Sequence, residues 1–282
     1  MSARHGTTDR VRRVTATAAI ALALLSAAPA AAATRILAVG DFGVGGSTER
    51  ATGAAIEAWE ADHPASVLLT LGDNDYTESP PAFRSNWHDA FGWLEGAGVW
   101  PRGTLGNHDV RVDGGRYEFK ALRMPSSHYQ RSRPDFDLFV LNSNSVGDRQ
   151  TRWLKRHLAA STATWKIVSL HHPAYTCGGY LSNPAVVSRW VPLFERYGVD
   201  LVLSGHDHNY QRFAPRNGVT YVVHGGGGQE LYALRSCPNG YPKRDFARRA
   251  HGFLDIVLRP GAIRLKAVNL SGNVIDRTAI NP

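Results

Sequence analysis

The sequence predicts a mixed α/β fold. Four apolar runs, at 36–39, 67–71, 165–170 and 200–204, have the length and composition of buried strands. Segments with apolar residues at helical spacing separate several of these runs, and the chain ends in consecutive strand-like segments. Strand–helix units followed by antiparallel strands favour a mixed α/β architecture over a simple doubly wound parallel sheet.

Each further element has its own signal. Helices are expected at 47–61, with Ser47 as the N-cap, at 148–160, and at 185–197, where Pro184 takes the first helical position. Additional strands are expected at 136–141, 218–224, 252–259 and 262–269. The last two flank Arg259-Pro260-Gly261 and predict a hairpin. Loop-rich segments are expected at 76–98 and 111–133.

Residues 1–33 have the features of a secretory signal peptide. Four arginines within 1–13 precede an apolar run at 14–25 and an alanine-rich exit at 26–33. The apolar part is shorter than the roughly 20 residues that a membrane span needs, so a signal is favoured over an anchor. The pair Arg12-Arg13 makes export by the twin-arginine pathway an alternative. Cleavage near Ala33 would leave 34–282 as a single exported domain with no further membrane span.

The charge balance narrows the classes of partner. The chain carries +8. Without the four Arg and one Asp of the leader, 28 basic residues remain against 23 acidic ones, or about +5. This mild excess is compatible with anionic substrates. No Lys/Arg-rich run with interleaved aromatics occurs, so nucleic-acid binding is not predicted. The oligomeric state is left open.

The chain has two cysteines, Cys177 and Cys237. In an oxidising compartment two cysteines of an exported chain are expected to pair. A bridge would join the loop after His171 to the segment after the glycine run 225–228. Two free thiols are the alternative.

Five short blocks carry side chains of the kinds that bind metals. They are Gly40-Asp41-Phe42-Gly43, Gly72-Asp73-Asn74-Asp75-Tyr76, Gly106-Asn107-His108-Asp109, Val168-Ser169-Leu170-His171 and Gly205-His206-Asp207-His208. One Gly-Asp block alone is usually only a turn. However, four of the five blocks end an apolar run, and open α/β sheets place their active sites at the carboxyl ends of strands. The blocks are therefore predicted to meet and to hold two metal ions.

With these blocks in this order, the chain resembles the calcineurin-like metallophosphoesterases, and more narrowly the purple acid phosphatases. The family pattern is Asp-x-Gly, Gly-Asp-x-x-Tyr, Gly-Asn-His-Asp/Glu, Val-x-x-His and Gly-His-x-His, and all of it is matched between residues 41 and 208. Tyr76 is the discriminating residue, because the wider superfamily usually lacks tyrosine at this spacing. The resemblance implies two mixed β-sheets packed as a sandwich and flanked by helices.

The resemblance also implies a role for each metal ligand. Asp73 would bridge both ions. The first site would be completed by Asp41, Tyr76 and His208. The second site would be completed by Asn107, His171 and His206. Carboxylate and phenolate oxygens suit Fe(III) in the first site, whereas imidazole and amide suit divalent Fe, Zn or Mn in the second.

The implied activity is hydrolysis of small phosphate monoesters. In the resembling family a metal-activated hydroxide attacks phosphorus in line. His108 would lie just outside the metals, hold the phosphate and protonate the leaving alkoxide. A phosphodiesterase or nucleotide hydrolase could use the same ions, because the entrance loops set substrate choice. A binding protein without catalysis is the remaining alternative.

Several neighbours of the blocks are expected to play supporting parts. His172 is expected to orient a ligand or its loop rather than to meet the substrate. His224 ends a predicted strand before the glycine run and is expected to pack beside the ligands. Asp75 and Asp109 are expected to anchor turns.

Overall fold

The structure is a computed structural model that describes residues 1–3, 6 and 33–282. The predicted leader lies almost wholly outside the described residues. Residues Ala33–Pro282 form one compact unit. Within the described part of the chain, no helix is both long enough and apolar enough to cross a membrane.

One mixed sheet of six strands has the order β13-β12-β11-β1-β2-β3. Its strands are β1 (Thr34–Val39), β2 (Val67–Thr70), β3 (Trp100–Arg102), β11 (Gly252–Arg259), β12 (Ala262–Asn269) and β13 (Val274–Ile280). The strands β1, β2 and β3 are parallel, whereas β11, β12 and β13 join them in antiparallel register. The predicted hairpin is the pair β11 and β12.

A second mixed sheet of seven strands has the order β10-β8-β9-β7-β6-β5-β4. Its strands are β4 (Tyr129–Ser132), β5 (Phe136–Val140), β6 (Trp165–Ser169), β7 (Leu201–Ser204), β8 (Tyr210–Phe213), β9 (Thr220–His224) and β10 (Arg244–Arg248). The central strands β5, β6, β7 and β9 are parallel. Every residue of β5, β7 and β9 is buried, as expected for strands covered on both faces.

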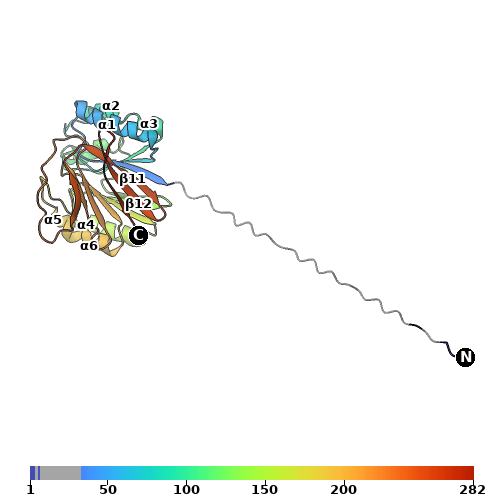
Figure 1. Ribbon diagram of the computed structural model, residues 1–282. Coiled ribbons are helices and arrows are strands. Elements are labelled where there is room, and N and C mark those ends of the chain that lie inside the picture. Colours follow the sequence, from blue (N-terminus) through green and yellow to red (C-terminus); the bar gives the residue numbers. More distant parts are fainter. Residues whose placement is uncertain (4–5, 7–32) are drawn as a thin grey trace. The chain divides into compact units, whose positions relative to one another are not determined.

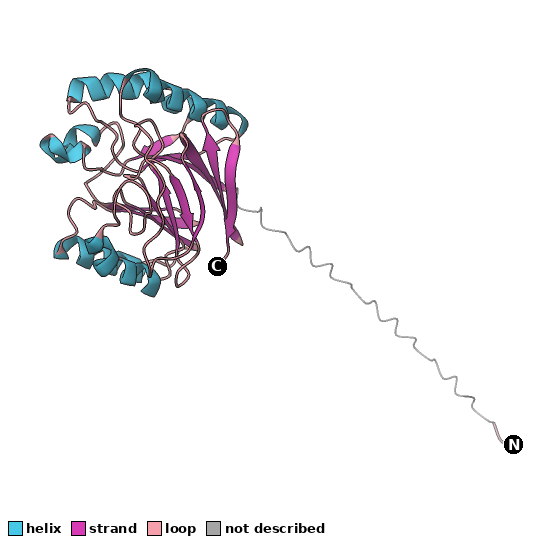
Figure 2. Cartoon of the chain, turned by 60° about the vertical axis from the view of Figure 1, so that its left-hand side comes forward, coloured by secondary structure: helices cyan, strands magenta, loops and turns pink. Residues whose placement is uncertain are grey.

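Helices cover the outer face of each sheet, so the predicted sandwich with flanking helices is confirmed (Figures 1 and 2). The helices on the side of the six-stranded sheet are α1 (Gly46–Asp62), α2 (Pro80–Phe91) and α3 (Leu94–Ala97). Those on the other side are α4 (Asp148–Ala160), α5 (Pro184–Arg189) and α6 (Val191–Arg196). Two short 3-10 segments, η1 (Asp109–Arg111) and η2 (Asp113–Glu118), lie between them in sequence.

Two apolar clusters hold these layers together. One includes residues of both sheets, such as Ile256 and Leu265 of the first and Leu138 of the second, together with residues of α1 and α2. The other packs the outer face of the seven-stranded sheet against the helices, where Trp190 and Phe194 are fully buried. Burial of apolar side chains is the main favourable contribution to the free energy of folding of a domain of this size.

Several element predictions differ from the structure. The expected loop at 111–133 ends in the strand β4, which pairs with β5. Ser47 is not the N-cap of α1, because Gly45 takes that position and its N–H is satisfied by the Glu49 carboxylate at 2.8 Å. The expected helix at 185–197 is divided at Trp190, because Pro192 has no N–H to continue the first segment. The expected loop at 76–98 contains α2, which begins at two consecutive prolines and buries Phe83, Trp87 and Phe91.

Candidate metal centre

The strand ends bring the predicted blocks to one rim of the sandwich. Asp41 follows β1 by two residues and Asp73 follows β2 by three. His171 follows β6 by two residues, and His206 follows β7 by two residues. The strands β1 and β2 are parallel neighbours, and so are β6 and β7. The four loops therefore leave each sheet at the carboxyl ends of its parallel strands.

Three buried side chains form the middle of the cluster. One donor atom from each of Asp41, Asp73 and His171 lies within 4.8 Å of the others. His171 Nε2 is 3.5 Å from Asp73 Oδ2. This is the spatial arrangement that a shared metal centre requires, because donors from different chain segments must face one small volume.

Tyr76 and His208 lie on the Asp41 side of this group. The Tyr76 hydroxyl is 3.2 Å from Asp41 Oδ1 and 3.2 Å from His208 Nε2. His208 Nε2 is in turn 3.4 Å from Asp41 Oδ1. The three donors therefore close a triangle in which oxygen atoms outnumber nitrogen.

Asn107 and His206 lie on the His171 side. Asn107 Oδ1 is 3.1 Å from His171 Nε2. The ring of His206 lies with its centroid 5.0 Å from that of His171, and its backbone N–H donates to Asp41 Oδ2 at 2.8 Å. The structure thus brings all seven predicted ligands together, with the amide of Asn107 and the imidazole of His206 beside His171.

Three of the seven predicted ligands have a strained backbone. Asp41, Asp73 and His206 have φ values of 60°, 50° and 69°, in the left-handed region that L-residues other than glycine rarely adopt. Such strain persists only where the surroundings enforce it, and it concentrates at functional sites. Here it turns each side chain sharply inward at the end of its strand.

Two glycines of the blocks are required by close approach. A Cβ on Gly106 would collide with the Asp73 carboxylate, and a Cβ on Gly205 would collide with the carboxylate of Asp41. The glycines therefore allow neighbouring loops to approach the two acidic ligands closely.

The charges of the cluster are out of balance without a cation. Burial raises the pKa of Tyr76, and the nearby carboxylates of Asp41 and Asp73 raise it further. Burial lowers the pKa of His171, but the attraction of Asp73 and Asp41 outweighs this and raises it to about 10. The site thus demands positive charge where these residues meet, and a bound cation would supply it in place of the proton.

The imidazole orientations also suit metal binding. His171 Nδ1 is 2.9 Å from the carbonyl oxygen of Leu71, and His208 Nδ1 is 2.8 Å from that of Glu230. A proton on Nδ1 satisfies both contacts and leaves the Nε2 lone pair directed at the cluster. The donor set therefore fits one hard, oxygen-preferring cation beside Tyr76 and one divalent cation beside Asn107.

His108 borders the cluster without joining it. Its ring centroid is 4.3 Å from that of Tyr76, and its backbone N–H donates to Asp73 Oδ1 at 2.9 Å. Burial lowers the pKa of His108, and the positive charge of Arg111 also lowers it, against an opposing effect of Asp73. Its position therefore fits a group that meets a substrate rather than a metal.

The expected anchoring role of Asp109 and Asp75 is confirmed. Asp109 accepts hydrogen bonds from the backbone of Asn74 at 2.8 Å and of Gly106 at 2.6 Å. Asp75 accepts from Thr77 N at 2.8 Å and from the Tyr117 hydroxyl at 2.9 Å. These bonds fix the loops that carry Asp73 and Asn107.

His172 lies beside the ligand histidines as expected, whereas the ring of His224 packs against Tyr210, with ring centroids 6.0 Å apart. His172 Nδ1 and Ser143 Oγ are 2.9 Å apart, and the His172 ring packs against His206 with centroids 4.5 Å apart. His224 is buried at the end of β9, and burial lowers its pKa to about 4. Burial likewise lowers the pKa of His172 to about 4, so both histidines are neutral packing groups.

Two tyrosines cover ligand histidines and were not expected from the sequence. Tyr180 stacks on His206 and Tyr232 stacks on His208, each with centroids 4.1 Å apart. The two tyrosine rings meet edge to face at 5.4 Å. Neither belongs to a motif, and only the nearby cysteines indicated that their loops lie close together.

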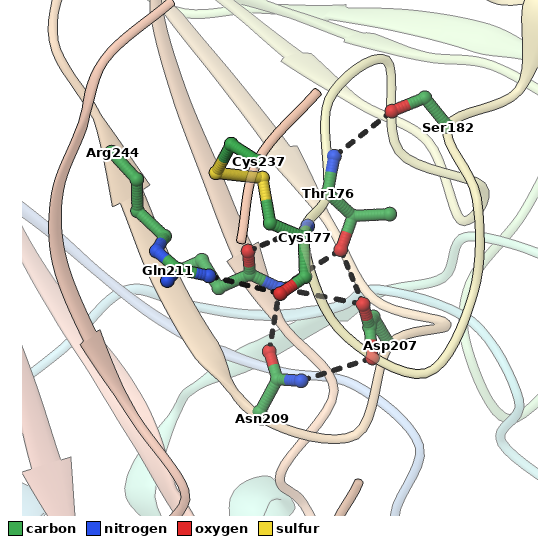
Figure 3. The surroundings of a disulfide bond; sticks show 8 residues. All are labelled: Thr176, Cys177, Ser182, Asp207, Asn209, Gln211, Cys237 and Arg244. Atoms are coloured by element: carbon green, nitrogen blue, oxygen red, sulfur yellow. Dashed lines mark hydrogen bonds between the residues drawn. A yellow bond between two sulfur atoms is a disulfide. The ribbon is translucent and has the colours of Figure 1, made fainter. Parts of the chain in front are cut away.

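The disulfide between Cys177 and Cys237 joins the loops that carry these tyrosines, so the expected pairing is confirmed (Figure 3). Cys177 N donates to Gln211 Oε1 at 2.8 Å. Gln211 and Thr176 both donate to the carboxylate of Asp207, the residue between His206 and His208 (Figure 3). The bridge is thus connected to the ligand loop by hydrogen bonds.

Comparisons with known proteins agree with this fold. A model of the calcineurin-like phosphoesterase family matches residues 19–210. Tartrate-resistant acid phosphatase type 5 of Mus musculus is 26% identical over 296 residues, covering 87% of this chain and 90% of the mouse chain.

Solved structures are similar at the level of the fold. Purple acid phosphatase PPD1 from yellow lupin has a TM-score of 0.75 at 20% identity, covering 88% of this chain. This chain spans about half of the lupin chain (54%). GAP50, described as the anchor in the inner membrane complex of Plasmodium, has a TM-score of 0.74 at 18% identity, with coverages of 88% and 89%.

The fold and the cluster define a metallophosphoesterase-like hydrolase. The chain belongs to the calcineurin-like phosphoesterase family, whose members are hydrolases of phosphoric ester bonds, and it is similar to the purple acid phosphatases within it. Because a protein described as an anchor has the same fold, substrate chemistry has to be argued from the site itself.

We predict that Gly106→Ala disrupts the metal centre while the domain stays folded. The added methyl group displaces the Asp73 carboxylate, so metal bound per chain should fall by at least half and hydrolysis should fall with it. Metal analysis and circular dichroism measure the two effects. The matched control is Gly96→Ala in α3, where a Cβ meets nothing within 4 Å, and equal metal loss there would contradict the argument.

Removal of the disulfide is expected to destabilise the protein. The cysteines are 60 residues apart, and the loop-entropy relation gives roughly 4 kcal/mol for a bridge of this span. Denaturant unfolding of the Cys177→Ala/Cys237→Ala variant should show this loss. Reductant should destabilise the wild type similarly and leave the variant unaffected, and an unchanged unfolding midpoint would refute the prediction.

Proposed function

We propose that the protein is an exported phosphatase that hydrolyses small phosphate monoesters at a centre of two metal ions. The proposed ligands are Asp41, Asp73, Tyr76, Asn107, His171, His206 and His208. His108 is proposed as the catalytic acid. We further propose that residues 1–33 are a signal peptide and that 34–282 form a single catalytic domain.

The observation that carries this proposal is the meeting of three buried donors from three separate loops. Asp41, Asp73 and His171 each offer an atom to a region less than 4.8 Å across. Two buried carboxylates side by side are costly unless positive charge compensates them. A site lined by carboxylates would repel a phosphate group. Bound cations would stabilise the carboxylates and would also attract the phosphate of the substrate.

The chemistry of the donors supports different ions in the two positions. Asp41 and Tyr76 provide oxygen donors for a trivalent ion such as Fe(III), whereas Asn107, His171 and His206 suit divalent Fe, Zn or Mn. When bound, such a pair supplies Lewis-acid charge to phosphate oxygens and lowers the pKa of water, so that hydroxide is available below neutral pH.

His108 has the features of a proton donor to a leaving group. It is held beside Tyr76 and its backbone is fixed by Asp73, so its ring has a defined position at the edge of the cluster. Its Nδ1 is buried and has no hydrogen-bond partner among the described residues. The imidazolium would donate to a substrate oxygen and pass a proton to the departing alkoxide.

Export is supported by the disulfide, because such bridges persist in oxidising compartments. The presence of all seven donors together with His108 supports an enzyme rather than a binding protein. A test of substrate class compares a phosphate monoester with a diester of the same alcohol. We expect kcat/KM to favour the monoester by roughly tenfold or more, and a preference for the diester would refute the monoesterase assignment.

A Tyr76→Phe substitution should remove the visible absorption of the iron-loaded protein. Only tyrosinate bound to ferric iron gives this charge-transfer colour, and phenylalanine has no oxygen donor. Visible spectroscopy with metal analysis provides the measurement. Tyr117→Phe is the matched control, since Tyr117 donates to Asp75 and is no proposed ligand. An active, colourless protein containing only zinc or manganese would refute the Fe(III) assignment.

The contribution of His108 should depend on pH and on the leaving group. Because burial lowers the pKa of His108 below its usual 6.5, the ring is protonated only in acid, and turnover of an alkyl phosphate should fall as pH rises through that range. His108→Gln should reduce this turnover by roughly 100-fold or more. The 4-nitrophenolate leaving group needs less protonation than an alkoxide, so the same substitution should reduce turnover of 4-nitrophenyl phosphate much less. Equal losses of turnover for both substrates would contradict the role of His108 as the catalytic acid.

A further inference from the structure

A cavity of about 230 Å³ lies where the edge strands of the two sheets meet. Its lining consists of Val67, Arg102, Arg131, Ser132, Arg133, Phe136 and Leu138. The Tyr129 hydroxyl of β4 donates to the Gly103 carbonyl after β3 at 2.8 Å and joins the two edges. Because Val67 begins β2 and Phe136 begins β5, the cavity is at the amino ends of these strands, whereas Asp73 follows the carboxyl end of β2.

The cavity is strongly cationic. Arg102, Arg131 and Arg133 line it, and all three belong to the described part of the chain. Within that part, none of them lies within 4.0 Å of a carboxylate. The nearby Asp137 is on the opposite face of β5 from Leu138, where Ser161 donates to it at 2.5 Å. The three arginines therefore line one cavity without a carboxylate partner among the described residues.

One of these arginines has an unmet hydrogen-bonding group. Arg131 Nε is buried and has no partner among the described residues. Burial lowers the pKa of Arg102, and the charges of Arg131 and Arg133 lower it further. The arginine side chains repel each other, and Arg131 has a buried N–H without an acceptor. Both features favour binding of an anion in the cavity.

Stacking on aromatic rings explains only part of the cluster. Arg123, whose charge also acts on Arg102, lies 4.0 Å from the centroid of the Trp100 ring, a close cation–π contact. The guanidinium carbon of Arg131 is 5.5 Å from the Tyr129 ring centroid, a longer contact. No aromatic contact of this kind involves Arg102 or Arg133 in the described residues.

The size and lining select the class of anion. Guanidinium groups match the oxygen pairs of phosphate with two parallel hydrogen bonds. Val67, Phe136 and Leu138 form a buried apolar part of the lining, and hydrogen bonds beside such a surface are stronger than in bulk water. Sites for drug-sized ligands measure ~300–1,000 Å³, so this smaller cavity suits a phosphate group.

We propose that Arg102, Arg131 and Arg133 form a second binding site for a phosphate-type oxyanion, separate from the metal centre. Its occupant is a phosphate dianion, either free or as the terminal phosphoryl group of a larger molecule. Comparing the affinities of the second site for orthophosphate and methylphosphonate distinguishes these sources. Tighter binding of orthophosphate identifies free phosphate as the occupant, whereas equal binding identifies a substituted phosphoryl group.

The test counts radiolabelled orthophosphate bound to the metal-loaded protein by equilibrium dialysis in 150 mM salt. The Arg102→Gln/Arg131→Gln variant should bind one phosphate fewer per chain than the wild type. The matched control, Arg84→Gln/Arg277→Gln, removes the same charge from exposed positions and should bind as the wild type does. The expected difference of one does not depend on phosphate binding at the metal centre, so failure here and failure of the proposed function are distinguishable.

An unchanged phosphate count in the first variant would overturn the proposal. An equal decrease in the control would also overturn it, because it would indicate diffuse attraction by the net charge. Circular dichroism establishes that the variants fold. If the double variant does not fold, Arg133→Gln decides the question, because Arg133 is exposed and its loss should weaken orthophosphate binding at the second site at least tenfold.

Discussion

The burial of Asp41 and Asp73 side by side is the constraint on which the rest of the site depends. Each acidic residue ends a parallel strand in a left-handed conformation, and a glycine from another loop approaches each carboxylate closely. Two such groups are stable together only with positive charge between them. The histidines supply part of that charge as protons, and bound cations would supply it more completely.

The surroundings hold this cluster in one arrangement. Asp109 ties together the loops that carry Asp73 and Asn107. On the other side, Asp207 connects the histidine loop to the disulfide-bonded loops that carry Tyr180 and Tyr232. Ligand groups positioned by such outer contacts need little reorganisation when a metal or substrate binds, which favours both affinity and catalysis.

The sequence predicted the parts of the molecule that depend on local pattern. Apolar runs identified the central strands, and the spacing of the blocks identified the donors that meet in space. Long-range packing could not be read in this way. The stacking of Tyr180 on His206 and the gathering of arginines from β3 and from the end of β4 arise from segments that are distant in sequence. The α2 helix lies inside a segment that was expected to be loop-rich, and it begins at two prolines, which are tolerated in the first turn of a helix.

The most direct test of the central claim is a crystal structure of the metal-loaded protein with anomalous diffraction data collected at the absorption edges of iron, zinc and manganese. The account predicts two anomalous peaks that share Asp73, one beside Tyr76 and His208 and the other beside Asn107 and His206. A single peak, or metal bound elsewhere with Asp41 and Asp73 left free, would contradict it.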